Sequence, residues 1–293
     1  MSWRVVVIHH TAKLDLQLGY LVVREGMNTT KIHISEIAVV LVESTAVSLT
    51  VGLLAELTNQ KVKVIFCDER RNPSSELVPY YGSHDTSNKV RTQIQWSRSI
   101  KEEVWTEIVR EKIRQQKFLL KEKGRDKEAE LLSEYIQELQ WFDESNREGH
   151  AAKVYFNALF GMGFSRSQDN YINAALNYGY SILLSAFNRE IVANGYITQL
   201  GLFHDNMFNP FNFASDLMEP FRILIDRQVC SMRLEDFEHS EKMQLVNVLN
   251  GEVFMEGKRY VVLNAIKRYV KSVFDALNDS DIAQLTFYSK DEL

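Results

Sequence analysis

Residues 91–124 read RTQIQWSRSIKEEVWTEIVREKIRQQKFLLKEKG, and at this segment the strand-like patterns of the chain give way to helical ones. Apolar side chains recur along it at the spacing of one helical face, namely Ile94, Ile100, Val104, Ile108, Ile113 and Leu120. Gly124 is a typical end for such a helix. Lysines and arginines alternate with acids between these positions, which is the pattern of a solvated face. The segment therefore predicts a long amphipathic helix.

The chain before this helix is rich in strand patterns. β-branched and alternating apolar residues fill residues 3–10, 13–25, 29–44 and 61–69. Residues 48–60 instead place their leucines at helical spacing and predict a short helix. A turn-rich segment with two of the four prolines follows. We expect a small β-rich, sandwich-like domain over residues 1–75 and a linker over residues 76–90.

Helical patterns continue to the end of the chain. Apolar side chains recur at helical spacing in residues 125–141, 148–160, 169–195, 215–232, 240–252 and 261–277. The sequence GMGFSRSQDN, which begins at Gly161, lies between two of these segments and lacks the third glycine of a nucleotide-binding loop. It predicts a turn or a helix C-cap. We therefore expect a larger all-α domain over residues 91–293 that carries the catalytic candidates, and an α+β fold for the chain.

Composition narrows the class of protein. The 293 residues carry a net charge of −5, which argues against a general coating of basic surface. Cys67 and Cys230 lie in apolar surroundings and predict buried free thiols in a reducing, cytoplasmic setting. No run approaches the roughly 20 apolar residues that a membrane helix needs. The sequence has no Walker, HExxH or CxxC pattern, so we expect neither nucleoside triphosphate hydrolysis nor a standard zinc site.

The segment GLFHDNMFNPFNFASDLMEPFR, residues 201–222, mixes one histidine and several acids with apolar and aromatic side chains. His204 stands fifteen residues before Glu219, and Asp216 stands one helical turn before it. Such a mixture suits a metal site with apolar walls. A second interpretation also fits, because Asp216-x-x-Glu219 is the pattern of a helix capping box and His204 would then be a hydrogen-bonded loop histidine. Arg222 could pair with either acid or reach a phosphate.

Glu148 is the first companion of this segment. In REGHAAKVYF it begins a helix and shares an inward face with Ala152 and Tyr155. A carboxylate on a buried face is costly unless it is paired or metal-bound. The alternative is an exposed glutamate that the helix dipole favours. One imidazole together with carboxylates would favour Mg²⁺ or Mn²⁺ over Zn²⁺.

Three motifs together resemble the CRISPR-associated adaptation integrases, the first family of Cas proteins, and most of all the version found in type II-A systems. They are EGHAAKVYF from Glu148, GFSRSQDNYINAALNYGY from Gly163, and the segment 201–222. The strand-rich first third and the helical remainder also match the layout of that family. The resemblance therefore extends over the whole chain.

The resemblance implies a specific site. Glu148, His204 and Glu219 would be the catalytic residues and would bind Mg²⁺ or Mn²⁺, and Asp216 would support them from behind. Without a metal the two glutamates would repel each other, so Mn²⁺ should raise the thermal stability of the protein. Our candidates for contacts with the DNA phosphates are Arg222 and Lys153.

The resemblance also implies a function and a set of partners. The chain would be a metal-dependent DNA integrase and endonuclease that joins the 3′-hydroxyl ends of captured foreign DNA to a CRISPR repeat by transesterification. Its DNA partners would be the double-stranded prespacer and the repeat with its leader. Its protein partners would be a second copy of itself, a small second Cas adaptation protein in a heterohexamer, and other type II-A adaptation proteins.

Two other functions fit the residues without that family. One is a metal-dependent nuclease that acts in repair or on branched DNA outside CRISPR. The other is a DNA-binding scaffold without catalysis, whose acids and histidine only cap helices and pair with arginines. Substitution of Glu148 and His204 distinguishes a catalyst from a scaffold.

Overall fold

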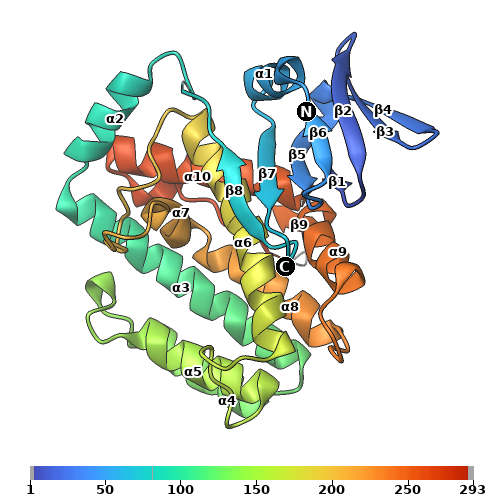
Figure 1. The fold of residues 1–293 in the computed structure, drawn as a ribbon. Coiled ribbons are helices and arrows are strands. Elements are labelled where there is room, and N and C mark those ends of the chain that lie inside the picture. Colours follow the sequence, from blue (N-terminus) through green and yellow to red (C-terminus); the bar gives the residue numbers. More distant parts are fainter. Residues whose placement is uncertain (1–2, 81, 290–293) are drawn as a thin grey trace.

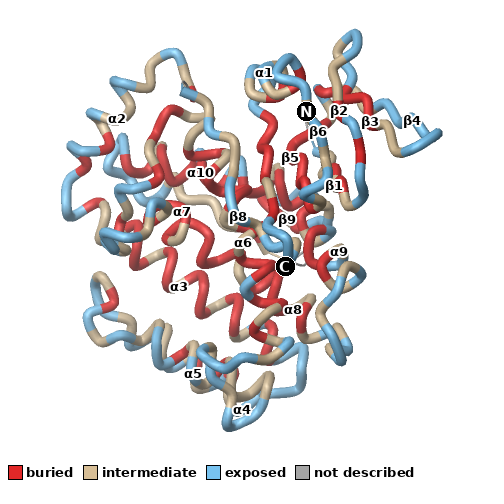
Figure 2. The backbone as a smooth tube through the Cα atoms, viewed as in Figure 1, coloured by how far each residue is buried: buried red, intermediate tan, exposed pale blue. Residues whose placement is uncertain are grey.

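The structure is a computed structural model that describes residues 3–80 and 82–289. Strands gather in the N-terminal part and helices make up most of the rest, which confirms the predicted α+β class (Figure 1). The described strands form two four-stranded sheets and one separate hairpin. Figure 2 shows that buried backbone runs from the central strands of one sheet into the helical part.

The outer sheet is mostly antiparallel. Its strands in spatial order are β4 (Asn28–His33), β3 (Tyr20–Glu25), β2 (Ala12–Gln17) and β6 (Val47–Leu49). The alternating pattern predicted for these strands places Leu14 and Leu21 in a core that also contains Val6 and Val40 from the second sheet. The two sheets therefore share one apolar layer, as the sandwich-like prediction requires.

The second sheet lies between that layer and the helices. Its strands in spatial order are β1 (Arg4–Ile8), β5 (Ile37–Val42), β7 (Lys63–Cys67) and β8 (Pro73–Leu77). Every residue of β5 is buried, because Val40 faces the outer sheet while Val39 and Leu41 belong to the helical core. The unbroken apolar run of this strand follows from having both faces covered.

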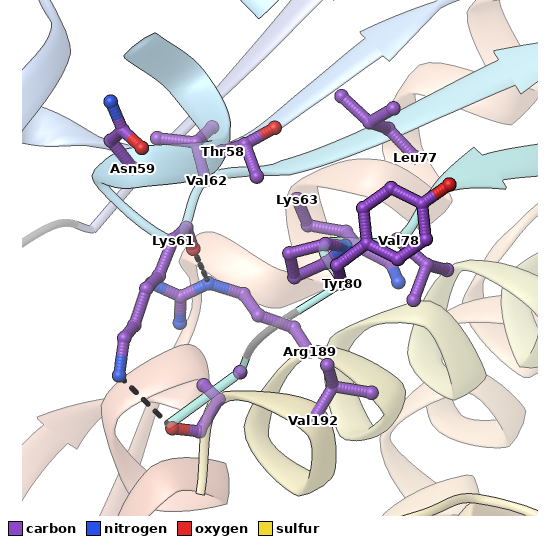
Figure 3. Close-up of a pocket in the computed structure, with 13 residues that line it drawn as sticks. Thr58, Asn59, Lys61, Val62, Lys63, Leu77, Val78, Tyr80, Arg189 and Val192 are labelled. Carbon is purple, nitrogen blue, oxygen red and sulfur yellow. Dashed lines mark hydrogen bonds between the residues drawn. The ribbon is translucent and has the colours of Figure 1, made fainter. Parts of the chain in front are cut away.

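One short helix and one cavity lie beside this sheet. Helix α1 (Val51–Asn59) begins at Thr50, whose hydroxyl accepts a hydrogen bond from the Leu53 amide at 3.3 Å. Arg189 donates to the Lys61 carbonyl at 2.8 Å, and the Lys61 ammonium donates to the Ala193 carbonyl at 3.0 Å. Figure 3 shows these contacts at a cavity of about 380 Å³ between α1, β7 and the helix that carries Arg189. They tie the sheet to the helical part.

The helical part is built around two long helices. Its members are α2 (Thr86–Gln95), α3 (Arg98–Glu122), α4 (Asp126–Gln137), α5 (Arg147–Phe160), α6 (Tyr171–Ala193), α7 (Asn212–Leu217), α8 (Arg222–Ser231), α9 (His239–Asn247) and α10 (Val262–Asp279). Helices α3 and α6 are buried along most of their length, whereas α4 and α5 lie on the outside against α3 (Figure 2). Strand β8 and helix α2 both enter the predicted linker, residues 76–90.

Two local predictions were wrong. The helix predicted for residues 91–124 is broken after Gln95, because Trp96 turns into the core and Ser97 caps a new helix through the Ile100 amide at 3.3 Å. The all-α prediction also missed a hairpin, whose strands are β9 (Glu252–Met255) and β10 (Lys258–Val261).

That hairpin turns at Glu256 and Gly257, whose φ angles are 53° and 70°. Positive φ at both central residues is what a two-residue hairpin turn of type I′ requires. Glu-Gly is a less familiar form of this signal than Asn-Gly, so the helical pattern on either side concealed it. The turn at Gly161, by contrast, is the predicted C-cap, with φ of 103° at the end of α5.

The structure also bears on the cysteines and on membrane-spanning helices. Cys67 and Cys230 are both free thiols; Cys67 is buried and Cys230 is half-buried. In the part of the chain that the structure describes, no helix is long and apolar enough to cross a membrane.

Candidate active site

Glu148 is positioned by an anchored helix start. It lies in the first turn of α5, which begins after Asn146 in the left-handed conformation. The buried Asp143 carboxylate accepts hydrogen bonds from the Arg147 amide at 2.7 Å and the Glu148 amide at 3.1 Å. This arrangement fixes the backbone of Glu148. Its side chain is 22% exposed and is positioned by a contact with Lys112. Asp143 escaped the sequence analysis because it precedes the helix.

Glu219 lies in a buried 3₁₀ turn, η3 (Glu219–Phe221), between α7 and α8. The turn packs against α3, and Arg222 Nε donates to Glu219 Oε1 at 2.9 Å. Burial by itself would raise the pKa of Glu219, but Arg222 and Lys112 outweigh it and hold the pKa below its usual value. Glu219 is therefore an ionised carboxylate at neutral pH.

The capping-box interpretation of Asp216 and Glu219 was wrong. Asp216 lies within α7 (Asn212–Leu217), not at a helix start, and neither α7 nor η3 has a side-chain cap. Asp216 is fully buried and turns its carboxylate toward the loop that carries His204. The spacing therefore does not reflect a capping box here. Asp216 contacts His204, whereas Glu219 contacts Arg222.

Asp216 orients His204 and the loop around it. Its carboxylate accepts hydrogen bonds from the backbone amides of Leu202, Phe203 and His204 at 2.6, 3.1 and 3.1 Å. His204 Nδ1 lies 2.5 Å from Asp216 Oδ1, so Nδ1 carries a proton, and in the neutral imidazole Nε2 then has the lone pair. The hydrogen bond with Asp216 raises the pKa of His204, against the effect of burial, and Glu219 and Glu148 raise it further.

Aromatic rings hold this loop from the other side. Trp105 of α3 stacks on Phe203 with ring centroids 4.6 Å apart, and its ring meets His204 edge-on at 5.9 Å. The aromatic residues of segment 201–222 therefore do contribute a wall beside the histidine, as the sequence suggested. A cavity of about 600 Å³ reaches His204 between this wall, α2 and the start of α3.

Gly201 has no space for a larger residue. A Cβ atom at this position would lie 2.4 Å from the His204 carbonyl oxygen and 2.6 Å from Asp216 Oδ2. We expect Gly201→Ala to lower the free energy of unfolding by about 1–3 kcal/mol, because the loop must move away from Asp216. Urea unfolding measures this. Gly163→Ala is the matched control, since nothing lies within 4 Å of a Cβ there. Equal losses of stability in both variants would mean that the close contacts of Gly201 do not matter.

Lys112 joins the two glutamates, and the sequence analysis missed it. Its ammonium forms an ion pair with Glu148 Oε1 and lies 2.5 Å from Glu219 Oε2. Burial would lower the pKa of Lys112, but Glu148 and Glu219 raise it above its usual value, so the group is charged. The sequence did contain a signal, because Lys112 follows Ile108 by four residues and so lies on the buried face of α3.

The predicted triad is therefore only partly assembled. Glu148 and Glu219 meet through Lys112, and both contribute to the electrostatic environment of His204. Within residues 3–80 and 82–289, no three His, Cys, Asp or Glu side chains lie together in a geometry that could hold a metal ion. Nevertheless the side chains present fit a hard divalent cation. Glu219 Oε2 is buried with the Lys112 ammonium 2.5 Å away, so it already holds a positive charge, and a neutral His204 with its proton on Nδ1 offers the lone pair of Nε2.

A small cavity lined by three cationic and two acidic side chains adjoins Glu219. It measures about 230 Å³ and is lined by Lys112, Gln116, Phe156, Arg166, Tyr180, Glu219, Arg222, Ile223 and Asp226. The guanidinium groups of Arg222 and Arg166 lie over the Tyr180 ring at 4.7 and 5.4 Å. The other phosphate candidate, Lys153, is exposed on α5 and is not part of this lining.

Asp226 fixes the ring on which those arginines lie. Its buried carboxylate accepts hydrogen bonds from the hydroxyls of Tyr180 and, at 2.9 Å, Tyr155. Burial raises the pKa of Asp226 to about 6, although both tyrosines and Arg222 oppose that rise. The three cations Lys112, Arg166 and Arg222 thus face one cavity beside a rigid aromatic support, which suits an anion of phosphate size.

Comparison with known proteins identifies the family. The profile of the family described as CRISPR associated protein Cas1 matches residues 5–248. The chain is 33% identical over 290 residues to the CRISPR-associated endonuclease Cas1 of Neisseria meningitidis serogroup C (strain 8013), and this alignment covers 97% of the chain and 95% of that relative. Both matches include the segments that hold Glu148, His204 and Glu219.

Solved structures share the fold. A casposase bound to its integration product superposes with a TM-score of 0.76 at 18% identity, covering 96% of this chain and 92% of that one. A Cas6-RT-Cas1–Cas2 complex gives a TM-score of 0.76 at 18% identity over 99% of this chain, which spans about a third (36%) of that longer chain. With the family profile and the Neisseria relative, these likenesses lead to one conclusion: the chain belongs to the CRISPR-associated Cas1 family of endonucleases.

Proposed function

We propose that this chain is a metal-dependent DNA integrase and endonuclease of CRISPR adaptation, which joins the 3′-hydroxyl ends of captured DNA to a repeat by transesterification. One observation carries the proposal. Two carboxylates, Glu148 and Glu219, come together through Lys112 beside a histidine that Asp216 orients, and a cavity whose lining includes three cations adjoins Glu219. This arrangement provides places for a hard cation and for a phosphate.

Three side chains would hold the metal ion. Glu148 and Glu219 offer carboxylate oxygens, and His204 offers Nε2 because Asp216 keeps the proton on Nδ1. Mg²⁺ or Mn²⁺ bound there would lower the pKa of the attacking 3′-hydroxyl and offset the charge that develops on the phosphate. The oxygen-rich set of donors suits these two ions better than Zn²⁺.

The cationic side chains would hold the DNA strand. Arg222 already contacts Glu219, and its guanidinium also lines the cavity, so it can orient a phosphate next to the carboxylates. Arg166 is fixed by the side-chain oxygens of Asn173 and, at 2.6 Å, Asn177. These contacts restrict a flexible guanidinium to one position, which reduces the entropy lost when it binds an anion.

The reaction balances without a nucleotide. One phosphorus–oxygen bond forms to the incoming 3′-oxygen while the bond to the 3′-oxygen of the target strand breaks. The proton that the attacking hydroxyl loses is matched by one that the leaving oxygen gains. With water as the nucleophile, the same exchange would cut DNA. One phosphodiester replaces another, so strand transfer needs no energy from nucleoside triphosphate hydrolysis.

The named relatives support the proposed partners. One structural neighbour is a complex that contains Cas2, and another is bound to an integration product. We propose that this chain binds double-stranded prespacer and repeat DNA, dimerises through its β-rich part, and forms a heterohexamer with a small Cas2-type protein. Other adaptation proteins of type II-A systems would join that assembly.

An integration assay tests the function. The chain and its Cas2-type partner would be incubated with a duplex bearing 3′-hydroxyl ends and a plasmid that contains the repeat. We expect joined products with millimolar Mg²⁺ or Mn²⁺ and none with EDTA, because the proposed site needs a divalent cation. Calcium is a useful control, since it is larger and takes more ligands. Undiminished strand transfer in EDTA would contradict the metal dependence.

A repair nuclease outside CRISPR makes a different prediction in the same assay. It would cut branched DNA without preference for the repeat, whereas an adaptation integrase should place its products at the repeat boundary. Sequencing of the joined products distinguishes the two. Products spread evenly over the plasmid would favour the nuclease.

A further inference from the structure

Lys112 occupies the position between Glu148 and Glu219, so a metal ion would have to compete with its ammonium for these carboxylates. Only 8% of the residue is exposed, and its ammonium contacts both Glu148 and Glu219. A buried ammonium is unfavourable unless oppositely charged groups surround it. Here both of its partners are the carboxylates to which we assign the metal. The lysine therefore already supplies part of the positive charge that this pair of acids needs.

The ammonium and a divalent cation cannot use the same oxygens together. Mg²⁺ binds carboxylate oxygens at about 2.1 Å, and Mn²⁺ prefers similar ligands. Lys112 Nζ lies 2.5 Å from Glu219 Oε2 and contacts the nearer oxygen of Glu148. A cation bound to both acids would then lie in contact with another positive charge. One of the two has to leave, and the lysine is the one with a flexible stem.

The structure also offers a place for the displaced group. Lys112 lines the cavity of about 230 Å³ in which Arg166 and Arg222 face Tyr180. A lysine side chain has a flexible four-carbon stem, so its ammonium can move into this cavity while α3 stays in place. There it would lie near two guanidinium groups and the Asp226 carboxylate, and a bound anion such as a phosphate would offset the repulsion between the three cations.

We propose that Lys112 is a built-in counter-ion: it holds Glu148 and Glu219 together in the metal-free protein, gives way when the divalent cation binds, and then turns to a DNA phosphate in the adjoining cavity. This inference rests on the proposed metal-dependent function. It also corrects the simple expectation that the two glutamates repel each other without a metal, because Lys112 lies between them.

The charges explain why such an exchange would be useful. In the metal-free protein the formal charges of Glu148, Glu219, Lys112 and Arg222 cancel. A divalent cation adds two positive charges to the same group, and DNA phosphates can neutralise them. Metal binding and DNA binding therefore favour each other, and the coupling must be reciprocal. The protein would hold DNA tightly in this cavity only when the catalytic ion is present.

Lys112→Met tests the first half of the proposal by metal binding alone. Without DNA, calorimetry with Mn²⁺ should show affinity at least about tenfold higher than for the wild type, because the competing charge is gone. The variant should also melt at a lower temperature without metal and gain more from Mn²⁺. Lys121→Met, an exposed change on the same helix, should leave all three quantities unchanged. Equal or weaker Mn²⁺ affinity in Lys112→Met would overturn the proposal.

A second variant guards against a failure to fold. If Lys112→Met does not fold without metal, the double variant Lys112→Met with Glu148→Gln removes one negative charge as well and should restore the melting transition. No recovery would mean that Lys112 stabilises the fold by packing, against the counter-ion role. Lys112→Arg keeps the charge, so its Mn²⁺ affinity should stay within about threefold of the wild type; a tenfold rise there would also contradict the role.

DNA binding tests the second half. With saturating Mn²⁺ and a duplex whose ends lack the 3′-hydroxyl, Lys112→Met should bind at least about fivefold more weakly than wild type, and the loss should disappear without metal. A loss that is equal with and without metal would sink the exchange. If the wild type itself binds no Mn²⁺, the proposed metal-dependent function fails; if the wild type binds Mn²⁺ and Lys112→Met is unchanged, only the role of Lys112 fails.

Discussion

Glu148→Gln is expected to reduce strand transfer by on the order of a thousandfold while the protein stays folded. Glutamine has the shape of glutamate but lacks its charge, so it weakens both the binding of the metal ion and the contact with Lys112. Glu148 is a better first choice than Glu219, because its side chain is 22% exposed against 4%. The integration assay measures the loss, and circular dichroism measures the melting temperature.

Two comparisons make this result specific. Glu144→Gln changes an exposed glutamate four residues earlier and should leave strand transfer unaltered. Glu219→Gln should cost as much activity as Glu148→Gln but also lower the melting temperature, since Arg222 and Lys112 lose a buried partner. Strand transfer by Glu148→Gln within about tenfold of the wild type would mean that Glu148 is not a metal ligand and that the scaffold hypothesis deserves preference.

The sequence predicted the members of the site better than their contacts. Glu148, His204 and Glu219 were found because their motifs resemble those of one family, and the structure places the two acids together. Their roles as metal ligands stay predictions. Lys112 was missed because α3 carries many lysines and arginines beside acids, and such a helix usually has only solvated charges. Only the packing of η3 and α5 against α3 shows which lysine is buried.

Local signals failed where tertiary contacts were stronger. Asp216 and Glu219 have the spacing of a capping box, yet Asp216 lies within α7, and its carboxylate accepts hydrogen bonds from three backbone amides of the preceding loop. The continuous helical pattern through residues 91–124 hid the break at Trp96, whose burial outweighs the gain of an unbroken helix. Strands β1, β3, β5 and β7 lie within segments that were predicted as strands, and β5 has both of its apolar faces covered, one by the outer sheet and one by the helices.

Asp216→Asn is expected to lower strand transfer by about 10²–10⁴-fold, because it changes the protonation of His204 and not the ligands themselves. The carboxylate accepts four hydrogen bonds, from three backbone amides and from His204 Nδ1. An asparagine has one acceptor oxygen and an amino group that donates. If the oxygen keeps the amides, the amino group meets Nδ1, so Nδ1 must become the acceptor and the proton moves to Nε2.

That tautomer has no lone pair on Nε2 for a metal ion. The loss in Asp216→Asn should therefore appear as weaker Mn²⁺ affinity, by about 10–100-fold, and part of the strand transfer should return at high Mn²⁺. Stability should fall as well, by about 1.5–3 kcal/mol, because buried amides lose a charged acceptor. Asp205→Asn, an exposed change beside His204, is the matched control and should alter none of these quantities. Unchanged Mn²⁺ affinity in Asp216→Asn, together with lower stability, would mean that Asp216 only holds the loop and does not direct the histidine toward a metal.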